Sequence, residues 1–162
     1  MEDRRPWIIV GGIAVSAFLV WWALTVSKGS RPPAVGKIGK VRVQKVDDNE
    51  SLILFDFNLK NDWNHPVVVR SIEATLDAAD GSAVEGHVIA ERDLNNVFKN
   101  YPELGEKYNP VLTSTDSVGA HDNIDRMLCI RFDASDDTIA KRRDIVIKLE
   151  DTSGIVTVIQ SK

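Results

Sequence analysis

Cysteine and concentrated positive charge are both scarce in this sequence. Cys129 is the single cysteine of 162 residues, so no internal disulfide can form, and an oxidising compartment is neither required nor excluded. The 20 Lys and Arg are interspersed with 24 Asp and Glu, giving a net charge of -4. A chain without a dense basic stripe is not expected to bind nucleic acid.

Motifs for catalysis and metal binding are missing as well. The three histidines lie far apart without zinc-ligand spacing, and no nucleophile elbow, P-loop or dinucleotide-binding glycine motif occurs. The acidic groups at 77–80 and 133–137 lack EF-hand spacing and are better explained by helix capping and solvation. Cys129 falls within a predicted strand, where we expect a buried thiol without a lowered pKa. The sequence therefore predicts no enzyme, cofactor, metal site or small-molecule substrate.

A long apolar run is the clearest feature that is present. Residues 7–26, WIIVGGIAVSAFLVWWALTV, contain no charge. As a helix with a rise of ~1.5 Å per residue they would reach about 30 Å, the thickness of the hydrocarbon core of a bilayer. We therefore expect a transmembrane helix at 7–26 after a short tail at 1–6. The alternative, a cleaved signal peptide, needs a shorter core and a small-x-small cleavage site, which Ala23-Leu24-Thr25 matches poorly.

Tryptophan and basic residues flank this run, as they do at membrane interfaces. The predicted interface residues are Arg4, Arg5, Trp7, Trp21, Trp22, Lys28 and Arg31. The count of positive charges after the run favours a cytoplasmic C-terminal domain, whereas the very short N-terminal tail is typical of a signal anchor with the domain outside. We expect the second arrangement.

Small residues form a stripe along the predicted span. The stripe consists of Gly12, Ser16, Leu19 and Ala23, which fall on one face of a helix. Small side chains at such spacing let another helix approach closely, so the stripe is a candidate surface for packing against a partner helix. The alternative is that glycine and alanine are merely common in membrane spans.

Alternation of apolar and polar residues begins after a linker expected at 27–40, which holds three glycines and two prolines. An apolar residue at every second position is typical of β-strands, so this pattern predicts a β domain over 41–162. Strands are predicted at 41–46, 52–59, 67–76, 83–90, 127–132, 145–150 and 155–160. The fully apolar face of the second strand, Ile53, Phe55, Phe57 and Leu59, should point to the core. Short strands with turn signals every 8–12 residues indicate an immunoglobulin-like antiparallel β-sandwich.

Residues 91–107 break the alternation. The apolar residues at helical spacing there are Leu94, Val97, Phe98 and Tyr101. They predict one helix of about ten residues, ended by Pro102 and packed on the sandwich. Ser135 is expected to cap a further short helical turn. The expected fold class is thus mainly β, an immunoglobulin-like sandwich with one inserted short helix, preceded by a single N-terminal transmembrane helix.

The domain resembles known families. The run FDFNLKNDWNHPVVVRSIEATLDAADG resembles the first half of β-sandwiches of the water-stress and late-embryogenesis-abundant type. The second half is similar to membrane-anchored bacterial proteins of a domain family of unknown function. The helix-and-loop motif of that similarity is Leu94, Phe98, Tyr101, Pro102, Leu104, Tyr108, Pro110 and Leu112, and its late motif is Arg131, Phe132, Arg142, Arg143 and Ile145. The resemblance implies a non-enzymatic, membrane-tethered sandwich.

Trp63 stands apart from the other aromatic residues of the predicted domain, because it lies between polar neighbours in a predicted turn at 61–66. It either covers the end of the sandwich or contacts a partner, since exposed tryptophan is enriched at interaction hot spots.

Together these features predict a single-pass protein of the bacterial inner membrane with a periplasmic, extracytoplasmic domain. We expect an accessory or structural subunit that packs its helix and its sandwich on a larger membrane protein complex, of a respiratory or photosynthetic type for example. The alternative is a free-standing stress-protective or envelope protein. The expected partners are the lipid bilayer and other membrane-protein subunits.

Overall fold

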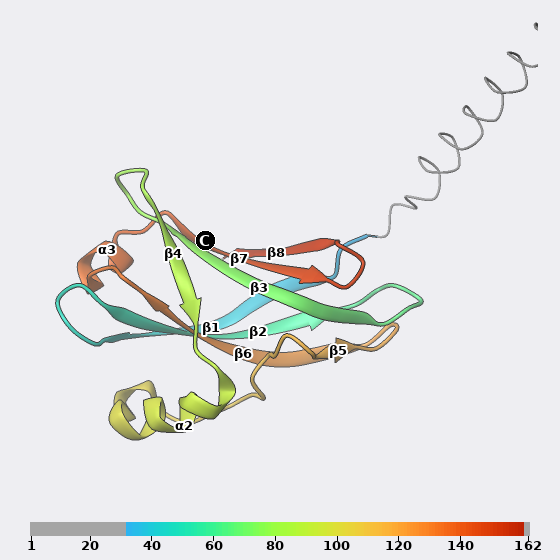
Figure 1. Ribbon diagram of the computed structural model, residues 1–162, viewed down its shortest axis with the longest axis horizontal. Coiled ribbons are helices and arrows are strands. Elements are labelled where there is room, and N and C mark those ends of the chain that lie inside the picture. Colours follow the sequence, from blue (N-terminus) through green and yellow to red (C-terminus); the bar gives the residue numbers. More distant parts are fainter. Residues whose placement is uncertain (1–31, 161–162) are drawn as a thin grey trace, which may run out of the picture. The chain divides into compact units, whose positions relative to one another are not determined.

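The computed structural model describes residues 32–160, which fold into an antiparallel β-sandwich with a few short helices. The strands are β1 (Val35–Lys45), β2 (Ser51–Lys60), β3 (Val67–Asp77), β4 (Ala83–Val88), β5 (Ser117–Val118), β6 (Asn123–Phe132), β7 (Asp144–Asp151) and β8 (Val156–Gln160). The helices are α2 (Glu91–Asn100), the 3-10 turn η1 (Pro102–Leu104) and α3 (Asp136–Ala140). The strands cross the domain in two layers, and α2 lies outside one of them (Figure 1).

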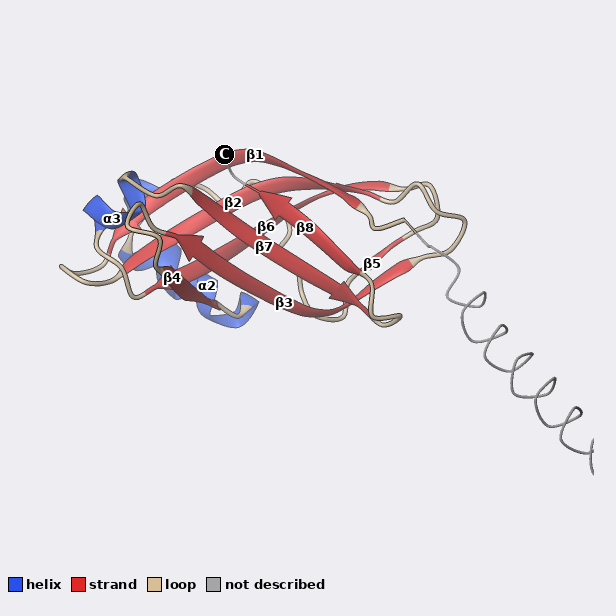
Figure 2. Ribbon diagram, turned by 90° about the horizontal axis from the view of Figure 1, so that it is seen from above, coloured by secondary structure: helices blue, strands red, loops and turns tan. Residues whose placement is uncertain are grey.

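The strand order is β1-β2-β6-β4-β3-β7-β8, with β5 paired to β3. One layer is β1-β2-β6 and the other is β3-β7-β8, as the two views together show (Figures 1 and 2). Strand β4 joins the layers, because residues 83–86 pair with β3 while residues 86–88 pair with β6.

Gly86 stands where β4 changes layers. A Cβ at this position would lie 2.6 Å from both Ile130 Cγ2 and Phe132 Cε1, which is closer than carbon atoms approach. A larger residue here would force the buried Ile130 and Phe132 side chains to shift, so glycine lets β4 lie close against the core.

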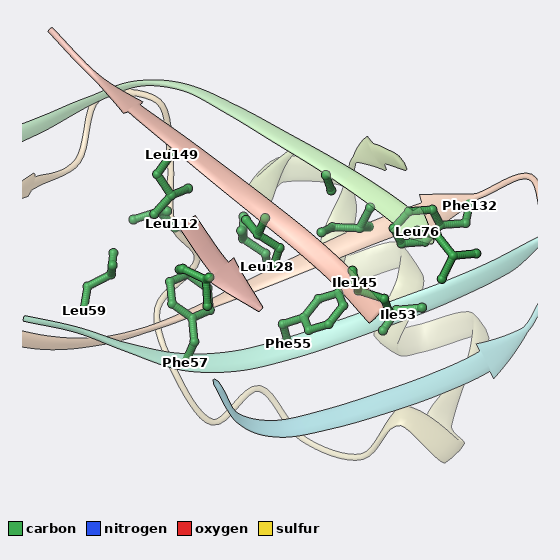
Figure 3. Packing of buried hydrophobic residues seen from close by; sticks show 14 of the residues in the cluster. Ile53, Phe55, Phe57, Leu59, Leu76, Leu112, Leu128, Phe132, Ile145 and Leu149 are labelled. Atoms are coloured by element: carbon green, nitrogen blue, oxygen red, sulfur yellow. The ribbon is translucent and has the colours of Figure 1, made fainter. Parts of the chain in front are cut away.

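The main core lies between the layers and is apolar. The predicted inward face of β2, namely Ile53, Phe55, Phe57 and Leu59, is buried in it as expected. Leu76 of β3, Leu128 and Phe132 of β6, and Ile145 and Leu149 of β7 meet these side chains (Figure 3). Removing this apolar area from water is the main force that holds the two layers together.

A second, smaller cluster lies on the outer side of the β1-β2-β6 layer. It consists of Leu52, Leu54, Leu94, Leu104, Val111, Met127 and Cys129. Leu94, the buried residue of α2, brings the helix onto the outward side chains of β2 and β6. Glu91 and Asp93 in the first turn of α2, and Lys99 in its last turn, suit the helix dipole.

The local expectations for 91–107 and 135–140 are confirmed. Helix α2 is ten residues long, Tyr101 is its C-cap, and η1 begins at Pro102. The Ser135 hydroxyl accepts a hydrogen bond from the Thr138 amide and so caps α3.

Two expected strand starts lie several residues from the observed ones. Strand β1 begins at Val35, so residues 35–40, expected in the linker, belong to the sheet. Glycines at 36 and 39 hide the alternation there, but Gly36 lies against the Ile159 side chain and has no room for a Cβ, while a bulge between Ile38 and Lys40 shifts the register. Strand β6 begins at Asn123 rather than at 127, because its polar first residues pair with β2 as far as Lys60.

Candidate interaction surface

The chain enters the sandwich at the end formed by the loops 61–66 and 119–122. Val35, the first residue of β1, is paired with Lys60, the last residue of β2, and Lys60 is paired with Asn123, the first residue of β6. The loop 61–66 follows Lys60 and the loop 119–122 precedes Asn123. We call these two loops, together with Val35, the Trp63 surface.

Asn61 fixes the first loop to the second. Asn61 is 1% exposed. Its side-chain NH2 donates to three backbone carbonyls, those of His65 at 2.9 Å, Val118 at 3.2 Å and Gly119 at 2.8 Å. Its side-chain oxygen accepts from the Trp63 amide at 3.0 Å, and its own amide donates to the Asp122 carbonyl at 2.9 Å. A buried amide with all its groups bonded holds a loop in one conformation without apolar packing.

Trp63 is half-buried at this end. Its ring centroid lies 6.3 Å from that of His65, with the rings tilted by 49°. The ring belongs to neither apolar cluster, nor to the partly buried side chains packed against them. The expectation that Trp63 contacts a partner stays a prediction.

His121 links the loops a second time. Its amide donates to the Trp63 carbonyl at 3.2 Å, and its Nε2 lies 2.6 Å from Asn64 Oδ1. Its φ of 56° is in the left-handed region, which costs free energy for a residue other than glycine. No sequence motif predicted a role for His121 or Asn61, although the Asn61-x-Trp63 spacing fits an Asx turn, in which an Asn side chain accepts a hydrogen bond from the amide two residues on.

A polar network lies on the outer side of the β1-β2-β6 layer, away from the Trp63 surface. Arg42 donates through Nη2 to Asp56 Oδ2 at 2.8 Å and through Nη1 to the carbonyls of Leu104 and Glu106. Asn109 donates to the other Asp56 oxygen at 2.9 Å. The Arg42 and Asp56 side chains are 10% and 9% exposed, so this ion pair is nearly desolvated. We call Arg42, Asp56 and Asn109 the Arg42 network; it ties the segment after α2 to β1 and β2.

Tyr108 covers the Arg42 network from outside. Its ring lies 4.8 Å from Arg42 Cζ and 4.9 Å from Lys40 Nζ, within the range of cation–π attraction. Tyr108 is 57% exposed, so it stacks on these cations from outside and does not pack in the core.

Cys129 lies in the second cluster and is buried, as expected. Burial raises the pKa of its thiol to about 12, an effect that the positive charge of Arg42 opposes. A thiol in this state is neutral at physiological pH and a poor nucleophile. Within residues 32–160 no group of three or more His, Cys, Asp or Glu is placed to hold a metal ion.

A cleft of about 330 Å³ opens beside the start of α2. Its walls are largely apolar, and its polar groups are a carboxylate and two hydroxyls, those of Glu91, Thr113 and Ser114.

The residues expected to meet membrane and partner helix, apart from Trp63, lie outside the described residues. These are Arg4, Arg5, Trp7, Trp21, Trp22, Lys28 and Arg31 for the interface, and Gly12, Ser16, Leu19 and Ala23 for helix packing. In the region 32–160 none of the helices has the length and hydropathy that a bilayer crossing requires.

Comparison with known proteins adds little beyond the fold. No model of a protein family matches the chain, and no curated protein matches it. Among solved structures, an uncharacterized β-sandwich protein from Clostridium difficile 630 matches with 10% sequence identity and a TM-score of 0.41, over 78% of this chain and 84% of that one.

Proposed function

We propose that this protein is a non-enzymatic accessory subunit, anchored by residues 7–26, that packs its helix and its sandwich on a larger complex of the bacterial inner membrane. The observation that carries the proposal is the short connection between the apolar run and β1. Only residues 27–34 separate them, and eight residues reach at most about 29 Å when fully extended. A domain on so short a connection stays close to whatever its anchor is embedded in.

We also propose that the domain is of the immunoglobulin-like class. One layer is β1-β2-β6 with the end of β4, and the other layer is β3-β7-β8. This strand order corresponds to that of the two sheets of constant-type immunoglobulin domains. Such sandwiches commonly serve as rigid binding modules, which supports a role in assembly, although fold alone does not assign function.

Purification in mild detergent tests the proposed role. An accessory subunit should co-purify with other membrane subunits in fixed stoichiometry, whereas a lone monomer would contradict the proposal and favour the stress-protective or envelope alternative. That alternative rests on the resemblance of residues 55–81 to water-stress sandwiches.

The helix stripe can be tested with matched variants. Gly12→Leu with Ser16→Leu should reduce co-purification, because bulky side chains would separate the helices. Ala14→Leu with Ala17→Leu adds the same bulk on another face of the expected helix and should leave co-purification unchanged. Equal effects of both pairs would remove the stripe from the proposal. A reporter fused to the C-terminus tests the side: the domain is proposed to be periplasmic, and activity of a cytoplasm-dependent reporter would overturn this.

A further inference from the structure

We propose that the Trp63 surface binds the lipid headgroup zone of the membrane that holds the anchor. This inference rests on the proposed function, because it takes the anchoring of residues 7–26 as given. It assigns to the described domain a second, lipid-directed contact in addition to the anchor itself.

The position of Val35, where the chain from the anchor enters the sandwich, supports a lipid contact of the Trp63 surface. Val35 is at the Trp63 surface, paired with Lys60, whereas the turn 46–50 follows the other end of the 11-residue strand β1. At about 3.3 Å per residue the two ends of β1 lie roughly 33 Å apart. The Trp63 surface is thus the end of the domain at which the connection from the anchor arrives, and the turn 46–50 lies at the opposite end.

The chemistry of this end suits an interface between water and lipid. Trp63 offers a half-buried indole, and Val35, which starts β1 at the same end of the domain, is 57% exposed. The acid Asp62 is paired with Lys60 at 2.8 Å, which reduces its repulsion from anionic headgroups. Amphipathic rings such as that of tryptophan concentrate at membrane–water interfaces.

The loop is also built to present Trp63 and not to bury it. Val67 and Val118, at 8% and 1% exposure, close the core next to this loop, and Trp63 is not among the side chains packed on either apolar cluster. Asn61 and His121 hold its backbone through hydrogen bonds instead. A rigid loop that keeps a large aromatic ring outside the core loses little entropy when the ring finds a binding surface.

Fluorescence of a single tryptophan tests the proposal in the full chain. The chain has four tryptophans, so Trp7→Phe, Trp21→Phe and Trp22→Phe leave Trp63 as the emitter. The variant is reconstituted alone into phosphatidylcholine vesicles, with and without lipids brominated near the headgroup end of the acyl chains. We expect bromination to lower Trp63 emission roughly twofold, as for a tryptophan seated at the interface. A matched chain with Trp63→Phe and Asn49→Trp, which moves the tryptophan to the turn 46–50, should show no lowering.

A companion chain separates failure of this inference from failure of the anchor. Trp63→Phe alone leaves Trp7, Trp21 and Trp22, and their quenching by brominated lipids reports insertion. If the companion is quenched while the Trp63 emitter is not, the lipid contact is overturned and the anchor stands. If the companion is not quenched, the anchor and the lipid contact both fall. Quenching of the Asn49→Trp chain equal to that of Trp63 would overturn the assignment to this end.

Discussion

The two faces of β2 are both buried, but by different means. Ile53, Phe55 and Phe57 face the opposite layer and lie in the main apolar core. On the other face, Leu52 and Leu54 lie under α2, and Asp56 is held by the Arg42 network. One strand thus carries a wholly apolar contact on one side and a mixed contact on the other.

The two faces therefore contribute differently: one mainly stabilises the sandwich, and the other mainly positions the segment after α2. Apolar burial is strong but not directional, so it holds the layers together without fixing each atom. The Arg42 guanidinium bonds the carbonyls of Leu104 and Glu106 as well as Asp56, and such bonds are directional. The outer face therefore fixes where the segment after α2 lies, in addition to what it contributes to stability.

Truncation in the main core should have the largest effect. Phe55 is 0% exposed, and Phe55→Ala is expected to cost about 3–5 kcal/mol of the free energy of unfolding, because it leaves a cavity between the layers. Denaturant unfolding of the full chain in mild detergent, followed by circular dichroism of the strands, measures the loss. Val43→Ala, at a position that is 39% exposed, is the control and should change stability by less than about 0.5 kcal/mol. Equal losses for the two variants would contradict a single dominant core.

Breaking the Arg42 network should come next. Arg42→Met leaves the Asp56 carboxylate buried without its cation, and we expect a loss of about 3 kcal/mol in the same measurement. Arg42→Met combined with Asp56→Leu removes both charges and should recover most of that loss. If the double variant is no more stable than Arg42→Met, the network contributes through geometry and not through charge compensation.

Loosening α2 should have a smaller and local effect. Leu94 is 1% exposed, and Leu94→Ala is expected to cost about 2 kcal/mol, because Leu94 is the fully buried side chain of α2. Hydrogen exchange should become faster at 91–104 while β3 and β7 keep their protection. Asn95→Ala, on the exposed side of α2, is the control and should leave exchange unchanged. Faster exchange throughout the sheet would show that the outer cluster supports the whole sandwich.

The sequence was most informative where apolar residues alternate. The inward face of β2, the helix at 91–100 and the Ser135 cap were all predicted, because each depends on neighbours within a few residues. The start of β1 was not, because Gly36 is explained only by Ile159, a residue far away in the sequence. Patterns report local preference, whereas close packing between distant strands has no local signal.

The polar parts of the candidate surfaces were harder to predict for the same reason. Trp63 was predicted as a candidate contact because it is an aromatic residue among polar ones. Asn61, which holds its loop, has the composition of an ordinary turn residue. Arg42 and Asp56 lie on adjacent strands and appeared as solvent-facing charges of an alternating pattern. Their pairing depends on the sheet register. Lys40 is opposite Asp56, and Arg42, two residues further along β1, is opposite Leu54 on the same face.

The smallest effect should appear at high pH, through Cys129 on the outer face of the sheet. Burial raises the pKa of this thiol from an ordinary value of 9.0 to about 12. Below pH 9 the thiol is neutral in the folded and unfolded chains and makes no difference; above it the unfolded chain ionises while the folded chain does not, so stability falls as pH rises. By about pH 10 this amounts to a loss of about 1.4 kcal/mol relative to Cys129→Ala, measured by unfolding both chains between about pH 8 and about pH 10. Cys129→Ala keeps every other titrating group, so the two chains should differ only through this thiol. If their unfolding free energies change with pH in the same way, the thiol ionises in the folded chain and the outer cluster opens to water.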